Sequence, residues 1–214
     1  MLTEKIAESL NKLNKEETLA NTKEALAKGY SAKKILLEGL SKGMEIVGDR
    51  FARKEYFVPD MLKASRIFND VLQELEPLIK KEAAKPFAKG ILGLVKGNTQ
   101  DNGKNIVRIM CEANGIKVED LGKSVPCEKF VEAARQGVDF IGLSVMTSSG
   151  VTEAKKVIKA LEDNGLRDKV KVIVGGAAVN ADRAIKIIGA DAYALDAIQA
   201  VSIIKQWFQP QQGN

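Results

Sequence analysis

The spacing of the apolar residues changes near residue 85 and divides the chain into two parts. Before that point apolar residues recur every three or four positions, as at Leu2, Ile6 and Leu10, which is the pattern of amphipathic helices. After it, short apolar runs alternate with helical stretches. The two patterns predict different architectures, so we expect an all-α domain over residues 1–85 and an α/β domain over residues 90–214.

The first part predicts four helices. One begins at the N-terminus, and a second covers about residues 15–28 and stops at Gly29, which accepts the left-handed conformation of a helix C-cap. Ser31 suits the N-cap of a third helix, and Pro59 suits the first turn of a fourth that runs toward Pro77. Four helices joined by short connections predict a small bundle.

The second part predicts a parallel sheet. It follows a charged stretch of small residues at 82–89, which contains Pro86 and is interpreted as a linker and hinge. The apolar runs lie at 90–95, 117–121, 138–145, 169–176 and 190–195, and amphipathic segments begin near Asn102, Glu128, Val151, Ala181 and Asp196. Five strands that are each followed by a helix predict a doubly wound parallel sheet with right-handed crossovers.

Small and polar residues follow three of the predicted strands, at 96–105, 144–150 and 175–180, and Tyr193 follows the fifth. In open parallel sheets ligands bind beyond the carboxyl ends of the strands, where the strand order reverses. Each loop alone is explained by the turns that any such fold needs. Their occurrence together at one edge of the sheet favours a rim that a large ligand approaches closely.

The absence of histidine restricts the chemistry of this chain. It excludes Ser-His triads, histidine-ligated metals and histidine general bases. The two cysteines, Cys111 and Cys127, are too few for a zinc site or a disulfide scaffold and indicate a reducing compartment. A net charge of +5 spread along the chain and 5% aromatic residues argue against a nucleic-acid partner. No apolar run has the length of a membrane span and charge begins at Glu4, so we expect no membrane contact and a cytoplasmic protein.

Nucleotide motifs fit poorly. Five residues separate Gly97 from Gly103, where a phosphate loop has four, and Lys104 is followed by Asn105 where Ser or Thr would hold magnesium. No GxGxxG follows a predicted strand. A flavin- or nucleotide-binding flavodoxin-like domain therefore stays as an alternative.

The sequence resembles the corrinoid proteins of methyltransferase systems and the cobalamin-binding module of methionine synthase, over essentially its whole length. The matching segments of the helical part are Gly43-Met44, Val47-Gly48-Asp49-Arg50-Phe51 and Glu55-Tyr56-Phe57-Val58-Pro59. Those of the α/β part are Gly97, Gly103-Lys104-Asn105, Ala113-Asn114-Gly115, Asp120-Leu121-Gly122, Gly142-Leu143-Ser144 and Gly175-Gly176. The resemblance implies a four-helix cap bundle followed by a flavodoxin-like (Rossmann-like) domain with a five-stranded parallel sheet.

The chain departs from this family at the signature Asp-x-His-x-x-Gly, in which the histidine ligates cobalt. Asn98 stands at the aspartate position, Gln100 at the histidine position, and Gly103 keeps the glycine; Gly150 stands where methionine synthase has a serine linked to that histidine by hydrogen bonds. An amide offers a neutral oxygen, which is a weaker donor than imidazole nitrogen. Gln100 is therefore interpreted as a weak or water-bridged lower-face contact, with an ordinary polar loop residue as the alternative.

The resemblance also implies the cofactor-binding residues. Phe51 and Val58 would cover the upper face of the corrin, with packing in the bundle core as the alternative. Ser144 and Ser148 would donate hydrogen bonds to the nucleotide tail, Gly175 and Gly176 would leave room for it, and Tyr193 would line the same slot or belong to the core. The full set is Phe51, Val58, Asn98, Gln100, Asp101, Asn102, Gly103, Ser144, Met146, Ser148, Gly150, Gly175, Gly176 and Tyr193.

The function that the resemblance implies is that of a methyl carrier. Cobalamin or a related corrinoid, with its base displaced and no histidine beneath the cobalt, would carry a methyl group between partner methyltransferases that load and unload it. A reductive activator is a further expected partner. Such a chain is a subunit of a methyltransferase system rather than a complete enzyme, because the cofactor carries the chemistry. A non-catalytic carrier or sensor of a corrinoid or another tetrapyrrole is the alternative.

Overall fold

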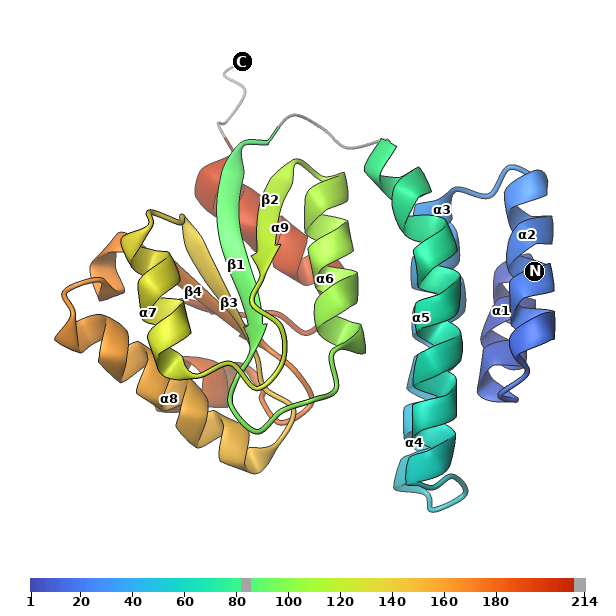
Figure 1. Ribbon diagram of the computed structural model, residues 1–214, viewed down its shortest axis with the longest axis horizontal. Helices are drawn as coiled ribbons and strands as arrows, with labels where there is room; N and C mark the ends of the chain where they lie inside the picture. The colour runs from blue at the N-terminus through green and yellow to red at the C-terminus, as the bar shows by residue number, and fades with distance from the viewer. Residues whose placement is uncertain (82–85, 210–214) are drawn as a thin grey trace. The chain divides into compact units, whose positions relative to one another are not determined.

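The structure is a computed structural model that describes residues 1–81 and 86–209 (Figure 1). The chain divides into two compact units, Met1–Glu82 and Ala83–Asn214. Of the predicted hinge at 82–89, residues 82–85 lie outside the described part of the chain.

The N-terminal unit consists of four helical rods, as predicted. These are α1 (Leu2–Asn11), α2 (Lys15–Ala27), a continuous rod made of α3 (Ala32–Lys34), the π-helical η1 (Ile35–Ser41) and α4 (Lys42–Ala52), and finally α5 (Val58–Lys81). Gly29 follows α2 with φ +80°, and the Ser31 hydroxyl accepts the amide hydrogen of Lys34, so both predicted caps are present.

Helix α5 continues through Pro77, where the sequence predicted it to end. A proline removes one hydrogen bond of the helix and crowds the preceding turn. Leu75 and Ile79 flank Pro77 and are both buried, so the apolar face of α5 keeps its core contacts on either side of the proline. Burial of that face outweighs the local cost and carries the helix on to Lys81.

Close helix packing in this unit depends on two glycines. A Cβ atom at Gly43 would lie 2.8 Å from Cδ2 of Leu10, and one at Gly39 would lie 3.0 Å from Cγ2 of Ile6. Both contacts join the third rod to α1, whose Ile6 and Leu10 are fully buried. The glycines therefore let the two rods approach more closely than larger residues would allow.

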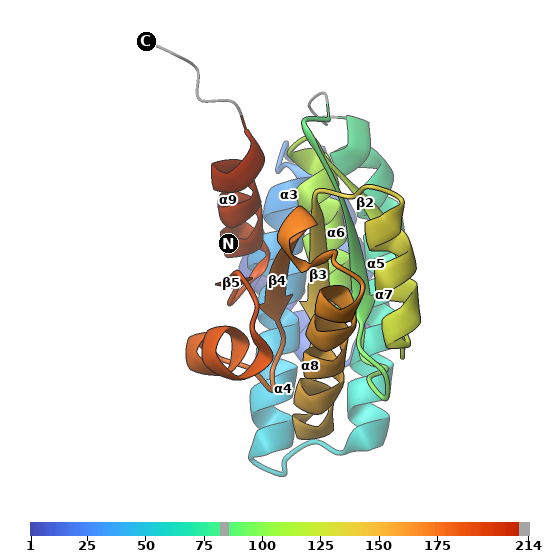
Figure 2. The same cartoon turned by 90° about the vertical axis from the view of Figure 1, so that its left-hand side faces the viewer.

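The C-terminal unit is a five-stranded parallel sheet with the strand order β2-β1-β3-β4-β5, which confirms the predicted fold class (Figures 1 and 2). Its elements are β1 (Ala88–Leu94), α6 (Asn102–Ala113), β2 (Ile116–Asp120), α7 (Cys127–Arg135), β3 (Phe140–Ser144), α8 (Ser148–Asp163), the 3-10 segment η2 (Arg167–Lys169), β4 (Lys171–Gly175), the π-helical η3 (Arg183–Ile188), β5 (Ala192–Tyr193) and α9 (Ala197–Phe208). The fifth strand is shorter than the predicted run at 190–195.

Helices cover both faces of this sheet. Helices α6 and α9 pack together on one face, and α7 and α8 pack together on the other (Figures 1 and 2). The core beneath α7 and α8 includes Ile91, Ile141 and Val172 from the three central strands. Because the chain places β2 on one side of β1 and β3 on the other, the strand order reverses between β1 and β3.

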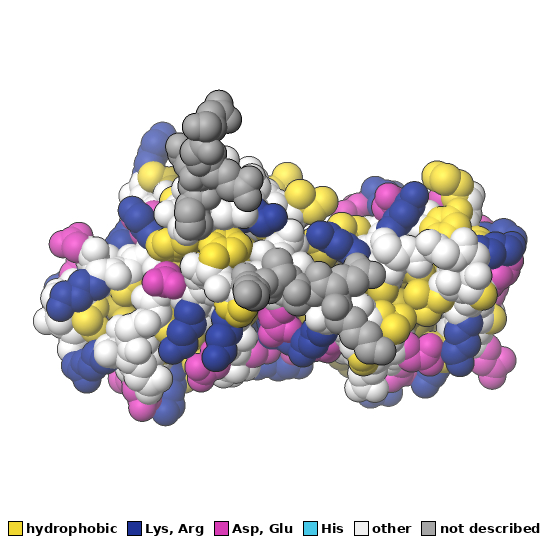
Figure 3. Space-filling model, turned by 90° about the horizontal axis from the view of Figure 1, so that it is seen from above, with side chains coloured by type: hydrophobic (Ala, Val, Ile, Leu, Met, Phe, Trp, Pro, Cys, Tyr) yellow, Lys and Arg dark blue, Asp and Glu magenta, His cyan; other side chains and the backbone are white. Residues whose placement is uncertain are grey.

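Basic and acidic side chains are interspersed on the face of each unit drawn in Figure 3. This distribution follows from the sequence, in which 33 basic and 28 acidic residues are spread along the chain. The basic side chains are therefore not gathered into one patch on the drawn face. In the part of the chain that the structure describes, no helix combines the length and the apolar composition needed to cross a membrane.

Candidate functional site

The predicted rim exists at the carboxyl ends of the three central strands. Ser144 at the end of β3 is in register with Leu94 of β1 and with Gly175 of β4. The three strands therefore end side by side, and the segments that follow them meet at one edge of the sheet. This edge contains the point where the strand order reverses, which is where ligands bind in such folds.

Asn98 ties the segment after β1 to the segment after β3. Its side chain is buried, with 1% of the residue exposed. Its Oδ1 accepts the backbone amide of Met146 at 2.7 Å and the hydroxyl of Thr147 at 3.4 Å, while its Nδ2 donates to the carbonyl of Lys96 at 3.2 Å. A buried amide that uses its oxygen and nitrogen in this way fixes the relative position of the two segments.

The segment after β2 holds the other side of the β1–α6 loop. The amide of Gly97 donates to the hydroxyl of Ser124 at 2.9 Å, and the amide of Ser124 donates to the carbonyl of Asn98 at 3.0 Å. An ion pair of 3.1 Å joins Lys123 to Asp101. Sequence reasoning missed Ser124 and Lys123, although the polar run that follows the second predicted strand was a usable signal.

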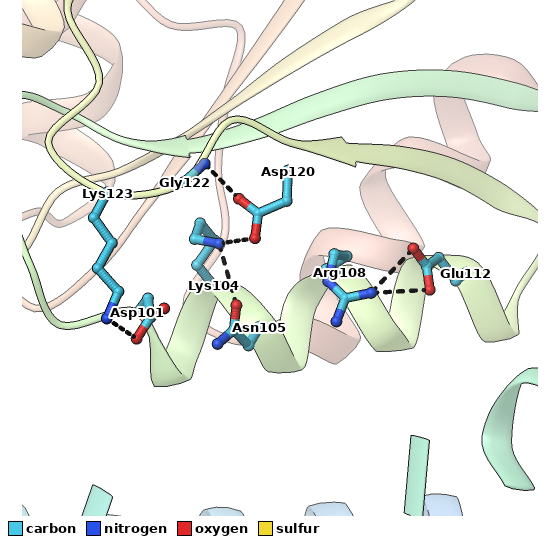
Figure 4. Close-up of polar contacts among 8 residues, drawn as sticks. All are labelled: Asp101, Lys104, Asn105, Arg108, Glu112, Asp120, Gly122 and Lys123. Atoms are coloured by element: carbon cyan, nitrogen blue, oxygen red, sulfur yellow. Dashed lines mark hydrogen bonds and ion pairs between the residues drawn. The ribbon is translucent and has the colours of Figure 1, made fainter. Parts of the chain in front are cut away.

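An ion pair between a buried lysine and a partly exposed aspartate lies beside this loop (Figure 4). Lys104, in the first turn of α6, is 4% exposed, and its Nζ pairs with Oδ2 of Asp120 and donates to Oδ1 of Asn105 at 3.1 Å. The second carboxylate oxygen of Asp120 accepts the amide of Gly122 at 2.8 Å. The pair therefore links the start of α6 to the turn that follows β2.

Gln100 lies at the exposed part of the same loop. Asp101 and Asn102, which follow it and begin α6, are half-buried, and Gly103 is exposed. The contacts of Asn98 and Asp101 thus fix the loop, and the exposed side chain of Gln100 lies between these two residues.

Gly150, in the first turn of α8, faces Asn98. A Cβ atom at residue 150 would lie 2.8 Å from Nδ2 and 3.2 Å from Oδ1 of Asn98. Its amide donates to the hydroxyl of Thr147 at 3.2 Å, which caps the helix. Ser148 in the same turn is exposed, whereas Ser144 and Met146 are half-buried.

Replacing Gly150 with alanine is expected to lower the free energy of unfolding by about 1–2 kcal/mol, because the new methyl group overlaps the fixed amide of Asn98. The change in stability is read from urea unfolding. Gly103→Ala in the first turn of α6 of the same unit is the control, since a Cβ there meets nothing within 4 Å and alanine favours a helix. Equal or greater stability of Gly150→Ala would contradict the crowding.

Gly175 and Gly176 are required by the backbone around them. A Cβ at Gly176 would lie 2.3 Å from the carbonyl oxygen of Val145, and the residue has φ +118°. A Cβ at Gly175 would lie 2.9 Å from the carbonyl oxygen of Ala194. The resemblance implies room for a nucleotide tail at these glycines, but a side chain at residue 176 would collide with the backbone of Val145.

Tyr193 at the end of β5 is half-buried and packs against the core between the sheet and α7–α8. It also pairs with Val174 of β4. These contacts agree with the alternative interpretation of Tyr193, in which it belongs to the core.

Phe51 and Val58 lie outside the core of the helical unit. They are 43% and 60% exposed, and Phe57 and Leu62, which the sequence reasoning did not single out, are also exposed. The turn that carries them is ordered by Tyr56, whose hydroxyl accepts from Arg50 at 3.0 Å and donates to the carbonyl of Asn11 at 2.6 Å. The alternative that Phe51 and Val58 pack in the bundle core is therefore wrong, because both side chains are exposed.

The cysteines and acidic residues do not form a metal site. Within residues 1–81 and 86–209, no three cysteine, aspartate or glutamate side chains come together in a way that could hold a metal ion. Burial raises the pKa of Cys111 to about 12, and partial burial together with the carboxylate of Glu128 raises the pKa of Cys127. Both thiols therefore stay protonated at neutral pH.

Comparison with known proteins matches both units to known domain families. A B12 binding domain model matches residues 88–202, and a second B12 binding domain model matches residues 2–76. The chain is 36% identical to a dimethylamine corrinoid protein of Methanosarcina barkeri over 208 residues, which cover 96% of each protein. It is 34% identical to a trimethylamine corrinoid protein of the same organism, covering 88% of this chain and 87% of that protein.

A solved structure agrees with these relatives. The monomethylamine corrinoid protein of Methanosarcina barkeri superposes with a TM-score of 0.88 at 32% identity, covering 95% of this chain and 97% of that one. Sequence and structure thus match over nearly the whole length of both proteins. The chain belongs to the family of B12-binding corrinoid proteins.

Proposed function

We propose that this protein carries methyl groups derived from a methylamine. The observation that carries the proposal is the similarity, at 32–36% identity over nearly the whole chain, to corrinoid proteins named for mono-, di- and trimethylamine. A bound corrinoid supplies a cobalt ion that accepts a methyl group from one methyltransferase and gives it to another. A reductive activator and a cytoplasmic location belong to the same proposal.

The residues present fit such a cofactor. A corrinoid brings its own equatorial cobalt ligands, so the protein needs no cage of metal-binding side chains. Gly175 ends β4 in register with Ser144 of β3, at the edge of the sheet where ligands bind in such folds. Ser148, in the first turn of α8, is exposed, and Ser144, at the end of β3, is half-buried; both hydroxyls are proposed to donate hydrogen bonds to the polar tail of the cofactor.

Gln100 is proposed to lie beneath the macrocycle in the place of a nitrogen ligand. Its exposure and its position between the fixed residues Asn98 and Asp101 support this assignment. An amide oxygen is a neutral and weaker donor than imidazole, so it binds the lower face weakly or through water. Phe51 and Val58, which the cap presents to solvent, are proposed to shield the upper face from water.

Reconstitution with hydroxocobalamin tests the proposal. We expect the protein to leave a gel-filtration column coloured, with a cobalt spectrum that lacks the features of nitrogen ligation from below. Gln100→His is expected to introduce those features, whereas Gln136→His, at an exposed position outside the site, leaves the spectrum unchanged. Colourless protein would contradict corrinoid binding, and an unchanged spectrum for Gln100→His would contradict the lower-face position.

A non-catalytic corrinoid carrier or sensor is the second candidate, because Gln100 replaces the strong nitrogen ligand of the family signature with a weaker amide donor. Methylation separates the two functions. With a methylamine and its methyltransferase, a methyl carrier turns over many equivalents of substrate, whereas a sensor or storage protein does not.

A further inference from the structure

Lys104 is a cation in an unusual place. Lysine is seldom buried without a partner, because removing its charge from water is costly. Here the residue is 4% exposed, although it stands in the first turn of a helix beside an open loop. Its ammonium group meets the carboxylate of Asp120, and Figure 4 shows the two side chains pointing toward one another between α6 and the end of β2. The sequence gives no reason to bury a lysine at this helical position.

The ion pair joins the two segments that hold the β1–α6 loop. On one side Lys104 belongs to the helix that the loop enters. On the other side Asp120 accepts the amide of Gly122 and so shapes the turn after β2. That turn supplies Ser124, which bonds to the amide of Gly97 and to the carbonyl of Asn98. Lys104 and Asp120 therefore lie at the base of the contacts that fix Asn98, and with it the loop that carries Gln100.

We propose that Lys104 and Asp120 are positioning residues that hold the β1–α6 loop in its binding conformation before a ligand arrives. The corrinoid part of this inference rests on the proposed function, whereas the effect on the loop does not. The constraint comes from the lysine, because Lys104 is buried whereas Asp120 is partly exposed. The buried ammonium group is strongly destabilising without its carboxylate, so it holds Asp120 and the turn after β2 against α6. A loop held in advance binds its ligand without the entropic cost of becoming ordered.

The first experiment uses the cofactor-free protein. Lys104→Met keeps the length of the side chain and removes its charge. We expect the amide hydrogens of Gly97 and Ser124 to exchange with solvent about tenfold faster than in the parent protein. Lys205→Met is the matched control. Lys205 lies in α9, and its Nζ donates to Oδ1 of Asn114 at 2.9 Å, at the C-terminal end of α6 and so at the end opposite Lys104. It should leave exchange at Gly97 and Ser124 unchanged.

A double variant separates positioning from general stability. Lys104→Met/Asp120→Asn also removes the partly exposed carboxylate that Lys104→Met leaves without its lysine, so its unfolding midpoint should be at or above that of Lys104→Met, while exchange at Gly97 and Ser124 stays fast. Two results would overturn the proposal: parental exchange at these amides in either variant, or an acceleration in Lys104→Met that is equal at the core amides of β3 and β4, which indicates loss of global stability only.

Hydroxocobalamin titration then tests the link to binding. We expect the dissociation constant of Lys104→Met to rise about tenfold and that of Lys205→Met to stay at the parental value. If the parent protein does not bind hydroxocobalamin, the proposed function fails while the exchange result still stands. If the parent binds and Lys104→Met binds equally well with a fast-exchanging loop, the positioning role for the ligand is refuted.

Discussion

Gly176→Ala is expected to destabilise the α/β unit by about 3–5 kcal/mol. The new methyl group would lie 2.3 Å from the carbonyl oxygen of Val145, and the backbone has φ +118°, which L-residues rarely adopt. The three nearest atoms are all backbone atoms of Val145, so there is no flexible side chain that could move aside. The substitution therefore forces a shift of the strand ends that build the rim.

Urea unfolding followed by tryptophan fluorescence measures this effect. The chain has one tryptophan, Trp207 in α9, so the signal reports on the α/β unit alone. Gly103→Ala is the matched control, because a Cβ in that first turn of α6 meets nothing within 4 Å; it should be neutral or stabilising by up to about 1 kcal/mol. Similar stabilities for the two variants would show that residue 176 tolerates a side chain.

Asn98→Ala is expected to cost about 2–4 kcal/mol in the same measurement. The substitution leaves the amide of Met146 without its partner at 2.7 Å, empties a buried site and releases the segment after β1 from the segment after β3. Buried polar groups that lose a partner keep their full desolvation cost, which makes this loss larger than that of an ordinary hydrogen bond.

Asn180→Ala provides the comparison for Asn98. The Oδ1 of Asn180 accepts the amide of Arg183 at 2.9 Å, but the residue is exposed, so water replaces the lost acceptor. Its removal should cost less than about 1 kcal/mol. If Asn98→Ala costs no more than Asn180→Ala, the buried amide does not hold the two strand ends together.

The sheet and the edge at which its central strands end were predictable because local patterns determine them. Buried parallel strands read as short apolar runs, and glycine and hydroxyl residues gather where such strands end. The register that brings Leu94, Ser144 and Gly175 side by side follows once the strands are parallel and of similar length. The position of the rim could therefore be predicted from the sequence.

Other parts of the site depend on contacts between distant residues. Nothing in the first turn of α6 distinguishes Lys104 from a solvated lysine; only the approach of Asp120, sixteen residues later, buries it. Phe51 has the apolar character of a core residue, and only the packing of the bundle leaves it outside. Pro77 suggests a helix end by its local chemistry, and tertiary burial of α5 overrides it.

The two thiols differ in access, and this makes the protein convenient for spectroscopy. Cys111 is sealed in the interior of the α/β unit, whereas Cys127 begins α7 at its surface. A maleimide dye at mildly alkaline pH therefore marks one known point, because alkaline conditions supply the thiolate that the raised pKa of Cys127 withholds at neutral pH. With an acceptor dye on a cysteine introduced at the exposed Lys54, energy transfer would follow the distance between the two units in solution as ligand is added.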